Sequence, residues 1–192
     1  MGILSKSLSN YCKLKTNKDI STALLVIPIS IRGFPEPFQK LSFSNCFVES
    51  YVPLKISGFS NQKEHLSYIH KIFNHLKSST YIYILYYIFS IVLLFFPLSL
   101  VNFLINFIGS KPSIVYSNLP STTTEVTFLV SQVERFIHFF NINFDIPFGF
   151  FVISYNQKIL FSCTSDKILD FMDPKEFVEE FQAIMQKEFL KE

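Results

Sequence analysis

Residues 148–163 read FGFFVISYNQKILFSC, in which Asn156 and Gln157 separate two apolar runs. Two-residue loops are the commonest connection between adjacent antiparallel strands, and Asn tolerates the positive φ angles that such loops need. The stretch therefore predicts a β-hairpin, the clearest one in the chain.

Four further stretches predict strands, namely residues 23–31, 41–56, 113–120 and 125–140. The first is a continuous apolar run, as in a buried strand. The second alternates Phe43, Asn45 and Phe47 with small side chains, which indicates one or two strands. The third is expected to end in a turn at residues 118–120, and the fourth to hold one or two strands.

Helical spacing replaces strand alternation in two segments. From residue 61 to 77, apolar side chains recur every three or four positions, which predicts an amphipathic helix with its histidines mostly outward. Residues 173–189 begin with Asp173, Pro174 and Glu176, the order of an N-cap, a first-turn proline and a capping box. The expected apolar stripe of this last helix consists of Phe177, Phe181, Ile184, Met185 and Phe189.

No charged residue occurs between Lys77 and Lys111. The run exceeds the roughly 20 residues that a transmembrane helix needs, and tyrosines crowd one end as in an interfacial belt. Pro97 interrupts the run where a helix would break. Two interpretations stay open. One is a single span with the N-terminus in the cytoplasm; the other, which we favour, is two helices meeting near Pro97 and buried in, or lying upon, a membrane-facing domain.

The predicted order of elements is β-β-α-(α-α)-β-β-β-β-α, which indicates an α/β fold with a layered mixed sheet and flanking helices. We divide the chain into an N-terminal segment, residues 1–19, and one domain, residues 20–192, which includes the apolar helical region at 80–109. The 192 residues are 49% hydrophobic and 17% charged. This composition excludes a disordered chain, a collagen-like repeat and a coiled coil.

The sequence contains no recognisable catalytic or metal-binding constellation. Its glycines form no phosphate-binding loop, and its three cysteines form no CxxC pair. His65, His70 and His75 follow one another at intervals of five, so they do not share a helix face and no metal site is expected. We interpret His138 as a strand residue with a local hydrogen bond. No basic cluster with interleaved aromatics suggests nucleic-acid binding.

Several segments occur in an order and spacing that match one known pattern. Residues 24–33, LLVIPISIRG, and 41–56, LSFSNCFVESYVPLKI, follow "vPvslR … lGNxf … vpLp". Residues 111–121, KPSIVYSNLPS, follow a segment with SNvpGP, and residues 145–166 follow a hairpin with SYnGkl and a final Asp. Residues 173–182, DPKEFVEEFQ, match the helix after it. Together they resemble the wax ester synthase/diacylglycerol acyltransferase family.

The resemblance implies the C-terminal half of a two-lobed enzyme, similar to the C-terminal lobe of CoA-dependent acyltransferases. Such enzymes transfer an acyl group from acyl-CoA, a substrate and not a cofactor, to a long-chain alcohol or diacylglycerol. Their catalytic His-His-x-x-x-Asp motif lies in the N-terminal half, and this sequence has no adjacent His pair. We therefore expect no catalytic residue in the chain, and a separate N-terminal half as its partner.

The resemblance carries over a set of substrate-binding candidates, namely Arg32, Asn45, Asn118, Pro120 and Ser154. Structural interpretations compete with it, because an arginine at a strand end often forms a salt bridge and asparagines often bond local backbone. Tyr155 is interpreted as a packing residue and Asp166 as bonding the backbone of its own turn. Ser121 and Thr122 depart from the family's Gly-Pro, and Gln157 from its Gly.

The same resemblance implies contact with a membrane surface, at the endoplasmic reticulum or a lipid droplet. Two other classes of function stay open. One is a small non-enzymatic membrane protein with a single transmembrane helix in residues 80–108. The other is a lipid-binding module that retains the scaffold and has lost the chemistry.

Overall fold

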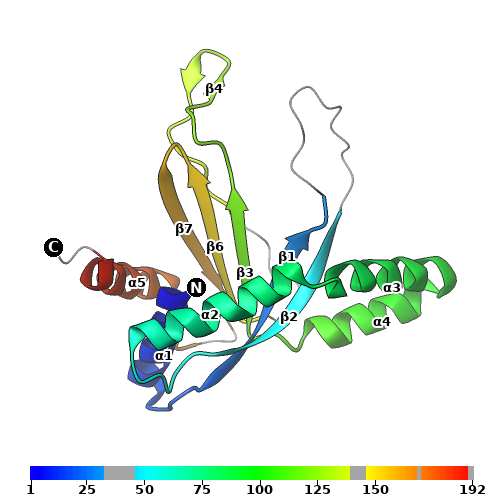
Figure 1. Ribbon diagram of the computed structural model, residues 1–192, viewed down its shortest axis with the longest axis horizontal. Helices are drawn as coiled ribbons and strands as arrows, with labels where there is room; N and C mark the ends of the chain where they lie inside the picture. The colour runs from blue at the N-terminus through cyan, green and yellow to red at the C-terminus, as the bar shows by residue number, and fades with distance from the viewer. Residues whose placement is uncertain (33–45, 139–145, 168–169, 190–192) are drawn as a thin grey trace.

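The computed structural model describes residues 1–32, 46–138, 146–167 and 170–189. Its centre is a five-stranded sheet with the order β2-β1-β3-β6-β7 (Figure 1). Strands β1, β3 and β6 run parallel to one another, whereas β2 and β7 run antiparallel to their neighbours at the two edges. The mixed sheet with flanking helices confirms the predicted α/β class.

The strands of this sheet are β1 (Thr22–Ser30), β2 (Phe47–Lys55), β3 (Ile114–Pro120), β6 (Phe148–Tyr155) and β7 (Lys158–Ser165). A separate two-stranded sheet pairs β4 (Thr127–Phe128) with β5 (Ser131–Gln132). The turn expected at residues 118–120 is wrong, because Asn118 pairs with Val152 and Pro120 with Ser154 as part of β3. Pro120 is the last residue of that strand.

The hairpin of β6 and β7 turns at Asn156 and Gln157, as predicted. Their φ angles are 47° and 59°, the two positive values of a type I′ turn. Glycine avoids the cost of that conformation, and Gln157 stands where the resembling family has glycine. The chain keeps the turn despite the less favourable residue.

Helices α1 (Gly2–Thr16), α2 (Gln62–Ser78) and α5 (Pro174–Phe189) pack on one face of the sheet (Figure 1). Phe177 and Phe181 of α5 are buried, as predicted, and their rings lie 4.9 Å from Phe148 and 5.0 Å from Phe150. Met185, predicted to be buried, is only partly so. Burying one such side chain stabilises the fold by about 1.5–3 kcal/mol.

The N-terminus of α2 is capped as its sequence suggests, because the Asn61 side chain accepts a 2.9 Å hydrogen bond from the Glu64 amide. The predicted inner and outer faces of α2 are wrong at two neighbouring positions. His65, expected on the outer face, is buried at 7% exposure, whereas Leu66, expected inside, is 42% exposed. Ser5 of α1 gives His65 a polar partner inside, which spacing within α2 alone does not reveal.

The start of α5 also differs from the capping-box prediction. Asp173 acts as expected, accepting a 2.8 Å hydrogen bond from the Lys175 amide. The Glu176 carboxylate instead binds the Tyr11 hydroxyl and Lys15, both in α1. The cap of α5 is therefore completed by another helix and not by its own first turn.

The uncharged stretch forms α3 (Tyr81–Phe95) and α4 (Leu98–Gly109), which meet at Pro97 as predicted and project away from the sheet (Figure 1). The buried version of this prediction is wrong, because most of their large apolar side chains are exposed. Among the described residues, no single helix is long and apolar enough to cross a membrane. The pair α2 and α3, bent by 53°, meets the length and composition requirement only together. A single transmembrane helix is thus not supported.

Candidate functional site

Three of the candidate residues meet at the carboxyl edge of the parallel strands. Asn118 and Pro120 end β3, and Ser154 lies opposite Pro120 on β6. Successive side chains alternate between the two faces of a strand, so Asn118, Pro120 and Ser154 share one face. Asn118 and Pro120 are exposed and Ser154 is half-buried. In open α/β sheets, ligands bind outside the carboxyl ends of the strands.

The sheet is interrupted beside this edge. Strands β1 and β3 are paired only at Leu25 with Ile114 and at Val26 with Val115. Within the described residues, β1 from Ile27 onward and β3 from Tyr116 onward share no further ladder pair. Their facing backbone donors and acceptors are therefore not used by this ladder, which suits contact with another chain or a ligand.

Arg32 lies two residues beyond the end of β1 and is exposed. Its amide donates a 3.3 Å hydrogen bond to Ser30 Oγ. The structure thus places Arg32 at the carboxyl end of a strand that diverges from β3. Asn45, the remaining candidate, lies outside the described residues.

The segment after β3 is anchored to the hairpin. The Ser121 amide donates a 3.0 Å hydrogen bond to the Ser154 carbonyl, and the Asn156 amide donates one of 3.0 Å to the Thr122 carbonyl. The hydroxyls of Thr122 and Thr124 lie 2.9 Å apart. These bonds fix the backbone at the position where the resembling family has Gly-Pro.

Tyr155 is the principal residue that anchors the segment around β4 and β5. Its side chain is 2% exposed, and its hydroxyl donates a 2.6 Å hydrogen bond to the Val133 carbonyl and accepts one of 3.0 Å from the Val126 amide. Its ring meets Phe136 edge-on at 4.8 Å. Packing was expected; the hydroxyl clamp was not, because no local pattern links residue 155 to residues 126 and 133.

His138 lies beside the buried Phe151, with ring centroids 5.3 Å apart. It was expected in a strand, but no strand includes it. Its backbone carbonyl accepts a hydrogen bond from the Ser162 hydroxyl of β7, which is a long-range contact and not the local bond that was expected. In the described part of the chain, no carboxylate is hydrogen-bonded to its imidazole. The described residues therefore supply no orienting acid of the kind that a histidine base uses.

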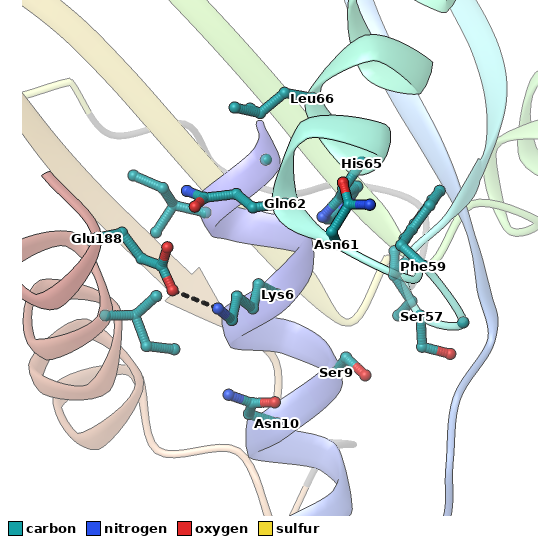
Figure 2. A pocket seen from close by; sticks show the side chains of 15 residues that line it. Lys6, Ser9, Asn10, Ser57, Phe59, Asn61, Gln62, His65, Leu66 and Glu188 are labelled. Atoms are coloured by element: carbon teal, nitrogen blue, oxygen red, sulfur yellow. Dashed lines mark hydrogen bonds and ion pairs between the residues drawn. The ribbon is translucent and has the colours of Figure 1, made fainter.

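A hollow of about 330 Å³ lies between α1, α5 and the start of α2 (Figure 2). At its wall, Ser5 Oγ is 2.8 Å from His65 Nε2, and Lys6 forms an ion pair with Glu188. Burial lowers the pKa of His65, and the positive charge of Lys6 lowers it further. Ser5 is fully buried and also donates to the Gly2 carbonyl, so its hydroxyl joins α1 to α2.

Within the described residues, no group of three or more His, Cys, Asp or Glu side chains has the arrangement of a metal site. Within the described structure, the three cysteines form no disulfide. Burial, with Asp173 nearby, raises the pKa of Cys163 to about 11, so this sulfur is a weak nucleophile at neutral pH. Cys163 is therefore a poor candidate for a catalytic nucleophile.

Comparison with protein families identifies the family of the chain, which the geometry alone does not. The model of the WS/DGAT C-terminal domain matches residues 43–187. The chain belongs to this family. This WS/DGAT domain contains both the open carboxyl edge and the α3–α4 pair within the matched range. No curated protein and no solved structure was found to match it.

Proposed function

We propose that this WS/DGAT domain is the C-terminal half of an O-acyltransferase that makes wax esters or triacylglycerols. Its acyl donor is acyl-CoA, and its acceptor is a long-chain alcohol or diacylglycerol. The observation that carries the proposal is the carboxyl edge of β3 and β6, which presents Asn118, Pro120 and Ser154 on one face in a chain of this family.

The chemistry divides between two halves. Transfer requires a base that takes the acceptor's hydroxyl proton as its oxygen attacks the thioester carbonyl. The new ester bond forms, the carbon–sulfur bond breaks, and the CoA thiolate leaves. The family resemblance assigns that base to the His-His-x-x-x-Asp motif of an N-terminal half. In this chain His65 is buried and bonded to Ser5, and His138 has no carboxylate bonded to its imidazole within the described structure.

The carboxyl edge then forms the opposite wall of the substrate channel. The Asn118 amide can donate to and accept from the amide groups of pantetheine. The Ser154 hydroxyl lies on the same face one strand away, and the cationic Arg32 suits a CoA phosphate. The apolar substrates place the working enzyme at a membrane, at the endoplasmic reticulum or a lipid droplet.

Complementation tests this proposal. An N-terminal WS/DGAT half with an intact His-His-x-x-x-Asp motif is assayed with and without this chain, using labelled palmitoyl-CoA and hexadecanol or diacylglycerol. We expect ester formation only from the two together, and about tenfold or greater loss of kcat/KM in Asn118→Ala. Gln182→Ala, an exposed residue of α5, is the matched control. Equal activity without this chain would contradict the proposal.

A further inference from the structure

The paired helices α3 and α4 expose an apolar surface that the rest of the described chain does not cover. Leu94, Phe95, Phe96 and Leu98, at the far end of the pair, are 76%, 73%, 48% and 71% exposed. We call these four residues the tip. Val101, by contrast, is 1% exposed, so the two helices have an interior of their own. An apolar patch of this kind marks an interaction surface.

The chemistry of the pair changes from its tip to its base. The tip is entirely apolar, whereas Tyr81, Tyr83 and Tyr87 are exposed along the first turns of α3, next to the rest of the domain. Tyrosines favour the boundary between hydrocarbon and water. Lys77 and Lys111 flank the pair at this same end, because the chain enters and leaves there.

The base also carries groups suited to phosphate. The Lys111 ammonium lies 4.5 Å from the centroid of Phe107, a position from which it can reach water above apolar surface. Beside the start of α3, a hollow of about 690 Å³ is lined by Lys71, His75 and Tyr81 among others. Its described lining contains no carboxylate, and Glu49, next to the lining residue Ser50, accepts a hydrogen bond from the Tyr51 hydroxyl. The charge at the base thus complements anionic lipid headgroups.

We propose that the α3–α4 pair inserts tip first into one leaflet of a phospholipid membrane. Helix α3, with 15 residues, is about 22 Å long, which exceeds the roughly 15 Å of hydrocarbon in one leaflet and falls short of a full span. A tilted hairpin therefore places its tip in the acyl chains and its tyrosines among the headgroups. Because a lysine flanks each end of the α3–α4 pair, the chain enters and leaves the membrane on the same side.

Several polar groups of the pair already have partners within it. Ser90 Oγ donates a 2.8 Å hydrogen bond to the Tyr86 carbonyl, so it carries no unpaired donor into lipid. At the tip, Pro97 has no amide hydrogen, and its carbonyl accepts the amides of Leu100 and Val101. The exposed Asn102 and Asn106 share one side of α4, which directs that side toward the headgroups.

The chain has no tryptophan, so a single introduced one reports its own depth. Leu94→Trp, Tyr83→Trp and the control Val130→Trp are mixed with vesicles of phosphatidylcholine and phosphatidylserine whose lipids are brominated at a shallow or a deep position. We expect deep bromines to quench Trp at 94 most and shallow ones to quench Trp at 83. Trp at 130 should not be quenched, because Val130 lies in the β4–β5 turn, far from the tip in the chain, and its side chain is 96% exposed.

Vesicle sedimentation completes the test. The double variant Leu94→Ser/Phe95→Ser should lose about tenfold or more of the partition coefficient, and Lys77→Gln and Lys111→Gln about fivefold each with anionic lipid. Leu129→Ser/Val130→Ser, equally exposed, is the matched control and should bind unchanged. Absence of quenching at 94 would overturn the proposal. So would a stable dimer, or a complex with the N-terminal half, that covers the tip and abolishes vesicle binding.

Discussion

The Tyr11 hydroxyl of α1 donates a 3.1 Å hydrogen bond to the Glu176 carboxylate of α5 and accepts one of 3.1 Å from the Asp173 amide. Its ring meets Phe177 edge-on at 5.6 Å. One side chain near the start of the sequence therefore completes the N-terminal cap of the last helix. Helix α1 is consequently part of the packed structure around the sheet.

Replacement of Tyr11 by Phe should lower the free energy of unfolding by about 1 kcal/mol, because the ring stays and the hydroxyl's bond to the Asp173 amide is lost. Urea denaturation measures the change. Tyr83→Phe, at an exposed tyrosine of α3, is the control and should change it by less than about 0.5 kcal/mol. Equal effects of the two variants would remove Tyr11 from the cap.

Replacement of Phe181 by Ala should cost about 3–5 kcal/mol, because the ring is buried against Phe150 and Phe161. The same denaturation series measures it, with Gln182→Ala on the exposed side of α5 as control. A loss below about 1 kcal/mol would be too small for a core residue and would refute this packing.

Replacement of Tyr155 by Phe should release the segment around β4 and β5 while the ring remains packed. The Val126 amide, bonded to the Tyr155 hydroxyl in the native protein, should exchange its hydrogen with solvent about tenfold faster or more. Hydrogen exchange followed by mass spectrometry measures this. Unchanged protection at Val126 would show that the hydroxyl does not hold the segment.

His65 should make the protein less stable in acid. Burial and Lys6 lower its native pKa below the value of about 6.5 in an unfolded chain, so the unfolded state binds the extra proton first. Stability is therefore full above that unfolded value and falls as pH drops through the native pKa. His65→Gln should flatten this decline in thermal unfolding, and the exposed His75→Gln should not. Parallel pH profiles for His65→Gln and the native protein would contradict the assignment.

The sequence predicts well where local chemistry determines the backbone. Asn156 and Gln157 turn the hairpin, Pro97 separates two helices, and Asp173 caps α5, each as its own neighbours require. Helix α1 was not predicted, although the sequence contains a signal for it. Leu4, Leu8, Tyr11 and Cys12 of α1 are buried at helical spacing, but serines and lysines between them dilute the pattern.

Predictions from the sequence are wrong where contacts between residues far apart in the chain determine burial and helix capping. His65 is buried because Ser5, 60 positions earlier, supplies a polar partner, and Glu176 leaves its own capping box for Tyr11 and Lys15. Within the candidate site, the pairing of Pro120 with Ser154 depends on the register of two strands from distant parts of the chain. Their shared face could not be read from either segment alone.

An assay of this chain by itself is the critical test of the proposal that catalysis requires a separate N-terminal half. Purified protein is incubated with labelled palmitoyl-CoA and either hexadecanol or diacylglycerol, in parallel with the His138→Ala variant. We expect no ester from either protein, because the base that receives the acceptor's proton is expected to come from the N-terminal half. Ester formation by the native chain that disappears in His138→Ala would contradict the proposal of a separate catalytic half. It would show that this chain is a complete enzyme with His138 as its base.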